Sequence, residues 1–364
     1  MLRCLREVRV PISAPDAISP AFQHTKEQLF RPFRFGQWAR LALVGLFAGE
    51  LSSGGGCNFN IPSTSSPRHQ DLFPPPHIDP ALLIPLVIVA VIAVPLLILL
   101  FLYVSSRMRF VLFDSVIERN CSIGRMWRAR RGPGLQYFVW QLVFCLISFG
   151  GVAVIIGIPA LIAFLLGWFT EPREHLAGLI LGGLLVFFVF FGWVLLTAVV
   201  HVFTKDFVVP QMALENVSAF EGWARLITML KAEKGKYAGY AGMKLVMAIG
   251  AGIVIGIAAL ILILVLLIPV GGLGVISVLL GQAAGLTWNV FTITMAVVAG
   301  CILLLLIFYG VSLISVPVIV FFPAYSIYFF AARYPLLSKL VYPPPSPPLA
   351  PPPPLVPPPP EPIG

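Results

Sequence analysis

The chain has 364 residues, of which 59% are hydrophobic and only 11% are charged, and its formal net charge is +9. A soluble domain carries about 25% charged residues, so this composition excludes an ordinary soluble protein and favours an integral membrane protein. The positive charge does not indicate nucleic acid, because the basic residues gather beside apolar segments, as they do at the ends of membrane spans. We therefore expect membrane lipids as partners and no nucleic acid.

Six apolar segments approach or exceed the length of about 20 residues that a helix needs to cross a membrane. The predicted fold is an all-α integral membrane domain over residues 1–342, followed by a proline-rich tail over residues 343–364 that has no core of its own. The six transmembrane helices are expected at about residues 35–52, 81–104, 137–168, 176–203, 240–270 and 287–332.

Three apolar stretches do not fit a single membrane span: the first is short, the second is long, and residues 271–286 are unusually rich in glycine. The first apolar segment is long enough only if it begins near Phe35. The second continues to about Ile117, and a helix over residues 81–118 would be about 57 Å long. Its end is therefore expected to project beyond a hydrocarbon core of about 30 Å and into the cytoplasm. Residues 271–286 are apolar, glycine-rich and without a charge, and we predict an interfacial or re-entrant turn there.

One motif occurs twice, each time between two apolar segments. Arg109–Arg128 reads RFVLFDSVIERNCSIGRMWR, and Asp206–Arg225 reads DFVVPQMALENVSAFEGWAR. We interpret each copy as the end of a membrane helix, a serine N-cap and a short amphipathic helix on the membrane surface. The predicted N-caps are Ser122 and Ser218.

A weaker third copy lies near the N-terminus, where Ser19 and His24 stand in the places of Ser122 and Trp127. The three copies predict three cytoplasmic amphipathic helices in a repeating unit of one surface helix and two spans. Aromatic and basic side chains on or beside such helices either bind anionic headgroups or only anchor the helix. The residues expected in one of these roles are Trp38, Arg125, Trp127, Arg128, Trp223 and Arg225.

The distribution of basic residues predicts the orientation. With six spans, residues 1–40, 105–136, 204–244 and 333–364 fall on one side of the membrane and hold 22 of the 24 Lys and Arg residues. The positive-inside rule places this side, with both termini, in the cytoplasm. The expected location is the cytoplasmic, or inner, membrane.

The outer loop after the first span contains two His-x-Asp pairs, His69 with Asp71 and His77 with Asp79. Imidazole nitrogens and carboxylate oxygens are ligands that zinc accepts. No helix or strand fixes the spacing of the two pairs, so we expect a solvated loop in preference to a metal site, and no cofactor is predicted.

The repeated motif also carries acidic side chains, Asp114, Glu118, Asp206 and Glu215. Paired carboxylates can serve in acid–base catalysis. Here they lie among Arg and Lys residues, and we interpret them as partners in salt bridges on surface helices. His201, near the end of the fourth apolar segment, is interpreted as a surface or packing residue.

The segment AFQHTKEQLFRPFRFGQWARLAL, at Ala21–Leu43, and the two motif copies carry a resemblance. With them the chain resembles a group of prokaryotic multi-pass membrane proteins of unknown function. These are similar to the membrane domain of some bacterial glycerophosphoryl diester phosphodiesterases. The resemblance covers residues 16–335, and the chain has no room for the catalytic barrel of about 250 residues. It therefore implies a membrane architecture and no catalytic residue.

These observations lead to one preferred function and two alternatives. The preferred one is a non-enzymatic membrane protein that acts as a lipid-facing scaffold or accessory subunit. The alternatives are a carrier for a lipid or other amphiphile, and a membrane enzyme with a metal site in the outer loop. The proline-rich tail over residues 343–364 is either a ligand for a partner protein with an aromatic-lined groove or a spacer without a partner.

Overall fold

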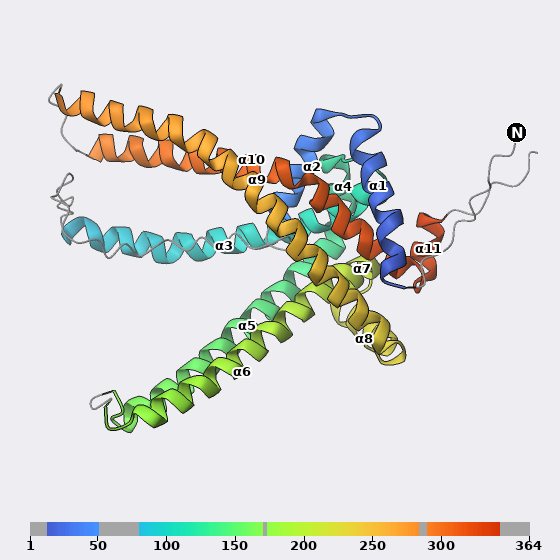
Figure 1. Ribbon diagram of the computed structural model, residues 1–364, viewed down its shortest axis with the longest axis horizontal. Helices are drawn as coiled ribbons and strands as arrows, with labels where there is room; N and C mark the ends of the chain where they lie inside the picture. The colour runs from blue at the N-terminus through green and yellow to red at the C-terminus, as the bar shows by residue number, and fades with distance from the viewer. Residues whose placement is uncertain (1–12, 51–79, 170–172, 284–289, 343–364) are drawn as a thin grey trace, which may run out of the picture.

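The computed structural model describes residues 13–50, 80–169, 173–283 and 290–342, and all regular structure within them is helical. A compact head lies at one end of the molecule, and long helical arms diverge from it (Figure 1). The elements in chain order are η1 (Pro15–Ala17), α1 (Ile18–Phe30), α2 (Phe35–Phe47), α3 (Pro80–Ile117), α4 (Ile123–Ala129), α5 (Arg131–Leu165), α6 (Leu176–Phe203), η3 (Thr204–Val208), α7 (Val209–Glu215), α8 (Ala219–Ala232), α9 (Lys234–Ala283), α10 (Val290–Ala331) and α11 (Pro335–Val341).

The arms are formed by the outer parts of α3, of the α5–α6 pair and of the α9–α10 pair. Their apolar side chains point outward; Leu185, for example, is 67% exposed, and Ile253 is 60% exposed. Exposed apolar surface of this extent is unfavourable in water, whereas lipid chains match it. Five helices of the described residues are long and apolar enough to span a membrane: Val91–Ile117, Arg131–Leu165, Leu176–Glu215, Lys234–Gly272 and Thr294–Ala331.

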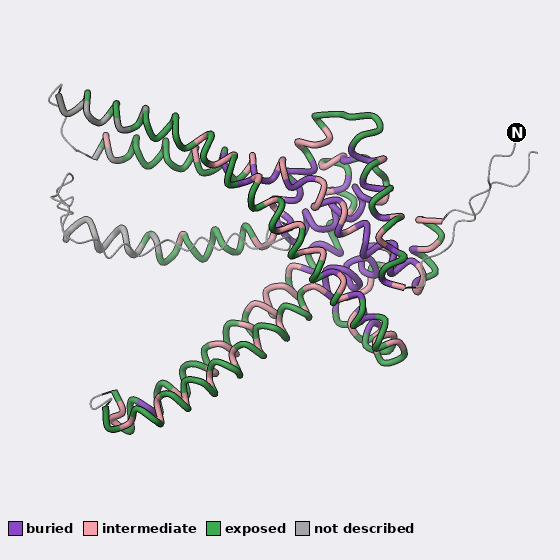
Figure 2. The backbone as a smooth tube through the Cα atoms, in the orientation of Figure 1, coloured by how far each residue is buried: buried purple, intermediate pink, exposed green. Residues whose placement is uncertain are grey.

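The head contains nearly all of the buried residues (Figure 2). Its core is aromatic, and Phe207 is at the centre, fully buried, with its ring centroid 5.1 Å from that of Tyr240 and 5.3 Å from that of Phe330. Phe110 packs edge-on against Tyr137 at 5.8 Å in the same core. Each motif copy has a Phe-Val pair at its start, and both pairs are core residues. Their burial turns this side of each helix toward the head.

The N-terminal helices α1 and α2 pack against the inner half of α10. Ser312 Oγ donates a hydrogen bond to the carbonyl of Ala42 at 2.5 Å, and Gly45 lies directly against Ile319. Helix α2 has 13 residues, so it is shorter than the span expected over residues 35–52. Residues 51 and 52 lie outside the described residues, and a sixth span remains a prediction.

Two long helices test the predictions about unusual segments. Helix α3 is continuous over 38 residues, as the apolar pattern predicted, and it is buried in the head from Ser105 to Val116. That its end projects beyond the membrane stays a prediction. The prediction of a turn at residues 271–286 is wrong for residues 271–283, because α9 remains helical as far as Ala283. Glycine and proline are tolerated in apolar membrane helices, so the glycine-rich composition did not end this one.

Candidate functional site

Five charged side chains lie together inside the head and come from four segments that are distant in the chain. Each is no more than 8% exposed. A buried charge is unfavourable unless it is paired and hydrogen-bonded, so the arrangement of these groups is a strict requirement of the fold and a candidate site. We call them the charge cluster; its members are Glu50, Arg109, Lys205, Asp206 and Lys244.

Lys205 and Asp206 enter the cluster from η3, a π turn between α6 and α7. Pro210 explains the local widening of the helix. It has no N–H to donate to the carbonyl four residues earlier, that of Asp206, and its ring would clash with that carbonyl in a regular α-helix. A single π turn relieves this conflict. The turn holds both charged side chains inside the head.

Two ion pairs account for four members of the cluster. Lys205 Nζ donates to a carboxylate oxygen of Glu50, which lies just beyond the end of α2. Asp206 accepts from Lys244 Nζ at 2.5 Å and from Tyr240 Oη at 2.9 Å, both on α9. Each carboxylate therefore has an ammonium partner, and the pairs join α2 to η3 and η3 to α9.

Arg109 on α3 is the fifth member and has no carboxylate as a hydrogen-bond partner. Its Nη2 donates to the carbonyl of Ala48 at 2.7 Å, and its guanidinium lies 5.8 Å from the ring centroid of Tyr137. Its Nε and Nη1 have no hydrogen-bond partner among the described residues. A cavity of about 20 Å³ adjoins it, lined by Glu50, Arg109, Leu112, Phe113, Lys205, Asp206, Val209, Pro210, Pro323, Ser326 and Ile327.

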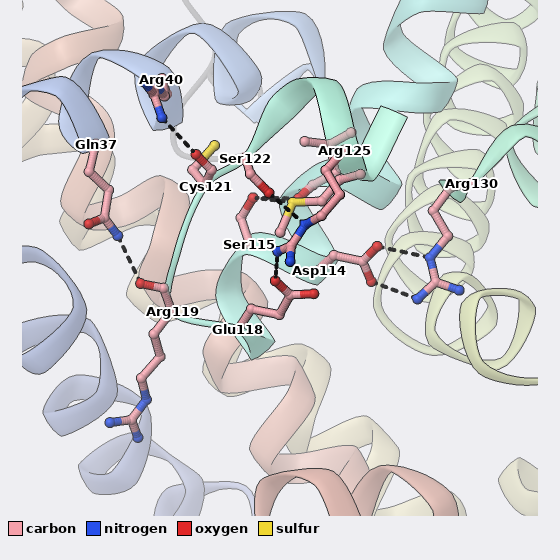
Figure 3. Close-up of polar contacts among 12 residues, drawn as sticks. Gln37, Arg40, Asp114, Ser115, Glu118, Arg119, Cys121, Ser122, Arg125 and Arg130 are labelled. Carbon is pink, nitrogen blue, oxygen red and sulfur yellow. Dashed lines mark hydrogen bonds and ion pairs between the residues drawn. The ribbon is translucent and has the colours of Figure 1, made fainter. Parts of the chain in front are cut away.

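A second polar layer surrounds the turn between α3 and α4 (Figure 3). Asp114 accepts two hydrogen bonds of 2.8 Å from the Nε and Nη2 of Arg130, and Glu118 forms an ion pair with Arg125. The four acids of the motif copies are all partners in salt bridges, as predicted. The predicted surface position is correct for Glu118, which is 45% exposed. It is wrong for Asp114 and Asp206, which are buried, because the helices that carry them continue into the head.

Helix α2 holds the other side of this turn (Figure 3). Gln37 Nε2 donates to the carbonyl of Arg119 at 2.9 Å, and Arg40 Nη1 donates to that of Cys121 at 3.4 Å. Arg119 has a φ of 56°, a left-handed conformation that leaves its carbonyl in a turn rather than in a helix. Two side chains of α2 thus fix the end of α3 and the start of α4.

The two motif tryptophans pack back onto the helix that leads into their own motif copy. Trp127 lies 4.5 Å from the guanidinium of Arg107, a buried side chain whose Nη2 also donates to the Trp127 carbonyl at 2.6 Å. Trp223 Nε1 donates to Thr204 Oγ1 at 3.0 Å. Both indoles are half-buried, so one side of each is covered by the head.

The predicted arginines lie on the outer faces of α4 and α8. Arg125 is 64% exposed, and Arg225, which pairs with Glu215 and Glu221, is 38% exposed. Arg128 is exposed, and its Nε donates to the carbonyl of Gly124 at 3.2 Å. These side chains are thus accessible from outside the head, although Arg125 and Arg225 are already paired with glutamates.

The two predicted N-cap serines, Ser218 and Ser122, differ in the group that their side chains bind. Ser218 Oγ accepts a hydrogen bond of 3.2 Å from the backbone N–H of Glu221, which confirms this N-cap. Ser122 stands at the N-cap of α4, but its Oγ accepts from Arg125 Nε at 3.0 Å and caps no backbone N–H.

The other predicted residues lie apart from the charge cluster. Trp38 packs against Phe30 and Phe33 beside the α1–α2 turn, with ring centroids 5.8 and 5.6 Å away. His201 is exposed, and its ring stacks on Phe144 at 6.5 Å, as expected of a surface or packing residue. The candidate ligands of the outer loop, His69, Asp71, His77 and Asp79, lie outside the described residues. The part of the chain that is described contains no group of three or more residues that could hold a metal ion.

Sequence reasoning missed Arg109, Lys205 and Lys244 as members of one site. The signal was present, because each lies within a few residues of the inner end of an apolar segment. A charge at such a position is also the ordinary mark of a membrane boundary. A buried cluster residue can be told from a boundary residue only when it is known which distant segments pack together.

Comparison with known proteins places the chain in a family. The model of a family of unknown function (DUF7544) matches residues 12–340, so the chain belongs to this family. No curated protein and no solved structure matches the chain.

Proposed function

We propose that this member of the family is a non-enzymatic integral membrane protein, a lipid-facing scaffold or accessory subunit. The observation that carries the proposal is the separation of the molecule into apolar arms and one polar head. None of the residues in the most apolar stretches of α5 and α6 is buried within the chain. Their surfaces are available to lipid or to the helices of a partner protein.

The position and lining of the cavities support a scaffold in preference to a carrier. A carrier encloses its cargo between spans and needs a cavity of several hundred cubic ångströms. The cavity beside Arg109 measures about 20 Å³, and a second one, beside His24, measures about 70 Å³. A third measures about 480 Å³, but it lies beside the α1–α2 turn and is lined almost entirely by polar and charged side chains, which suit water better than an amphiphile. All three lie in the head, whereas the arms diverge (Figure 1).

The proposal includes an orientation. The head faces the cytoplasm of a cell bounded by an inner membrane, because 22 of the 24 Lys and Arg residues lie in the segments that build it or flank it. A sixth span over residues 35–52 places both termini on that side. The proline-rich tail over residues 343–364 then lies in the cytoplasm, where a partner protein could bind it.

The motif copies supply the lipid contacts in this proposal. The surface helices α4 and α8 lie at the cytoplasmic interface, with α1 as the third of the set. The exposed Arg125, Arg128 and Arg225 meet anionic headgroups, while Trp127 and Trp223 anchor their helices to the head. The parallel packing of the two indoles against Arg107 and Thr204 supports an internal repeat.

Photo-crosslinking residues in the arms test this function. A photoreactive residue at Leu146, Leu185 or Ile253, which are 66%, 67% and 60% exposed, is expected to form adducts with lipid or with a second protein. One at Phe110, which is fully buried, should react only within the chain and serves as the control. Abundant crosslinks between the α5–α6 arm and the α9–α10 arm of one chain would contradict the proposal, because a closed bundle around a path is the arrangement of a carrier.

A further inference from the structure

We propose that the head binds one small monovalent anion of halide size in the cavity beside Arg109. This goes beyond the scaffold function and does not depend on it. Four charged residues line the cavity, Glu50, Arg109, Lys205 and Asp206. We call it the anion cavity.

The first argument is the charge balance. Among the described residues, the charge cluster contains three cations, Arg109, Lys205 and Lys244, against two carboxylates, Glu50 and Asp206, which is an excess of one positive charge. An uncompensated charge is strongly unfavourable when it is buried, because the medium around it is far less polarisable than water. One bound monovalent anion makes the cluster neutral.

The second argument concerns hydrogen-bond donors. Arg109 is 5% exposed, and its Nε and Nη1 have no partner among the described residues, although Nη2 is used by the Ala48 carbonyl. Buried donors without an acceptor are rare in folded proteins. Both carboxylates on the cavity wall are already occupied, Glu50 by Lys205 and Asp206 by Tyr240 and Lys244.

The third argument is size. A volume of about 20 Å³ exceeds the roughly 10–15 Å³ that one water molecule requires. The space beside the guanidinium therefore suits one small occupant. The hydroxyl of Ser326 donates to the Pro323 carbonyl at 2.9 Å, so the guanidinium supplies the free donors for the occupant. A monatomic anion fits both the space and these donors.

The position of the cavity indicates what the anion does. Its wall combines Glu50 beyond the end of α2, Arg109 of α3, Lys205 of η3 and Ser326 of α10. These residues belong to segments that lead into different arms. The anion therefore holds the arms in one arrangement, and its binding stabilises the folded head.

Thermal unfolding of the full-length protein in detergent tests the proposal. The midpoint temperature is measured in sodium chloride, sodium bromide and sodium gluconate at equal ionic strength. Above the dissociation constant, the midpoint is expected to rise on the order of 2 °C for each tenfold increase in chloride or bromide. Gluconate is too large for the cavity and should give no such rise.

Variants and anomalous diffraction identify the site. Arg109→Gln is expected to abolish the halide dependence, whereas Arg107→Gln, which changes a buried arginine outside the cavity wall, should retain it. Crystals soaked in bromide should show an anomalous peak within hydrogen-bond distance of Arg109. If Arg109→Gln does not fold, the proposal is tested by the halide series on the unaltered protein and by the bromide peak.

Two outcomes would overturn the proposal. Equal midpoints in chloride and gluconate, with no bromide peak at Arg109, would mean that the cavity holds water. A bromide peak without any halide-dependent stability would mean an adventitious ion only.

Discussion

Lys205 and Glu50 stand 155 positions apart in the chain and form an ion pair in which the two side chains are only 6% and 2% exposed. The pair joins the end of α2 to the π turn that follows α6. Pairing at this depth depends on the whole head, since it brings together two segments that are distant in the chain. The charge cluster therefore ties segments of different arms together.

Breaking this buried ion pair should destabilise the folded head far more than breaking an ion pair at the surface. We expect Glu50→Leu to lower the free energy of unfolding by about 3–5 kcal/mol, because it removes the carboxylate that pairs with the buried ammonium group of Lys205. Glu50→Leu combined with Lys205→Met should recover much of that loss. The measurement is unfolding in mixed micelles with increasing denaturing detergent.

Glu118→Leu is the control, since the Glu118–Arg125 pair is exposed, with side chains that are 45% and 64% accessible. We expect a change below about 1 kcal/mol. Equal effects of Glu50→Leu and Glu118→Leu would show that the charge cluster does not hold the head together.

The contact between α2 and α10 requires glycine at position 45. A Cβ added to Gly45 would lie 2.5 Å from Ile319 Cδ1 and 2.7 Å from its Cγ2. We expect Gly45→Ala to destabilise the head by about 1–3 kcal/mol through overpacking, and Ile319→Ala in the same chain to restore part of this loss.

Gly124→Ala is the matched control, because nothing lies within 4 Å of a Cβ at this position in α4. It should be neutral or stabilise by up to about 1 kcal/mol, as alanine favours helix. A Gly45→Ala variant as stable as Gly124→Ala would contradict the close packing of α2 on α10.

His24 makes the stability of the head depend on pH. Burial, together with the positive charge of Arg119, lowers its pKa from 6.5 to about 4. The unfolded chain takes up a proton as the pH falls through 6.5, whereas the folded head does so only near pH 4. The stability from the neutral imidazole is therefore complete above pH 6.5, is lost as the pH falls toward 4, and at pH 5 is reduced by about 2 kcal/mol.

The variant His24→Gln should remove this part of the pH dependence. Free energies of unfolding of the two proteins, measured between pH 7.5 and about 4, give the comparison. Identical slopes below pH 6.5 would show that His24 does not remain neutral in the folded head.

The tryptophans of the motif copies report on the interface. Each is half-buried, with Trp127 stacked on Arg107 and Trp223 bonded to Thr204. In chains that retain only one of them, lipids with brominated chains are expected to quench the fluorescence more strongly than aqueous iodide. Quenching by iodide as efficient as for a solvated indole would contradict interfacial helices, and protection from both quenchers would mean that the indoles are core residues.

The sequence was sufficient for the helical membrane class and for most helix positions, because long apolar segments leave few alternatives. The continuation of α3 to Ile117 was predicted from the apolar pattern, but its burial in a head was not. The charge cluster did not follow, because Asp206 and Lys244 resemble ordinary residues at a membrane boundary until α9 is placed beside η3. The π turn at Lys205 depends on Pro210 in the folded helix. The apolar pattern gave no indication that the helix widens at this point.

The central claim, an array of membrane arms fixed to a head on the cytoplasmic side, is tested most directly by topology reporters. Fusions are made after residues 60, 130, 172, 232 and 340, and each is read by an enzyme that is active on only one side of the membrane. The account predicts that the fusions after residues 60 and 172 read outside and that those after 130, 232 and 340 read inside. An outside reading at residue 130, in the turn between α4 and α5, would contradict both the six spans and the cytoplasmic head.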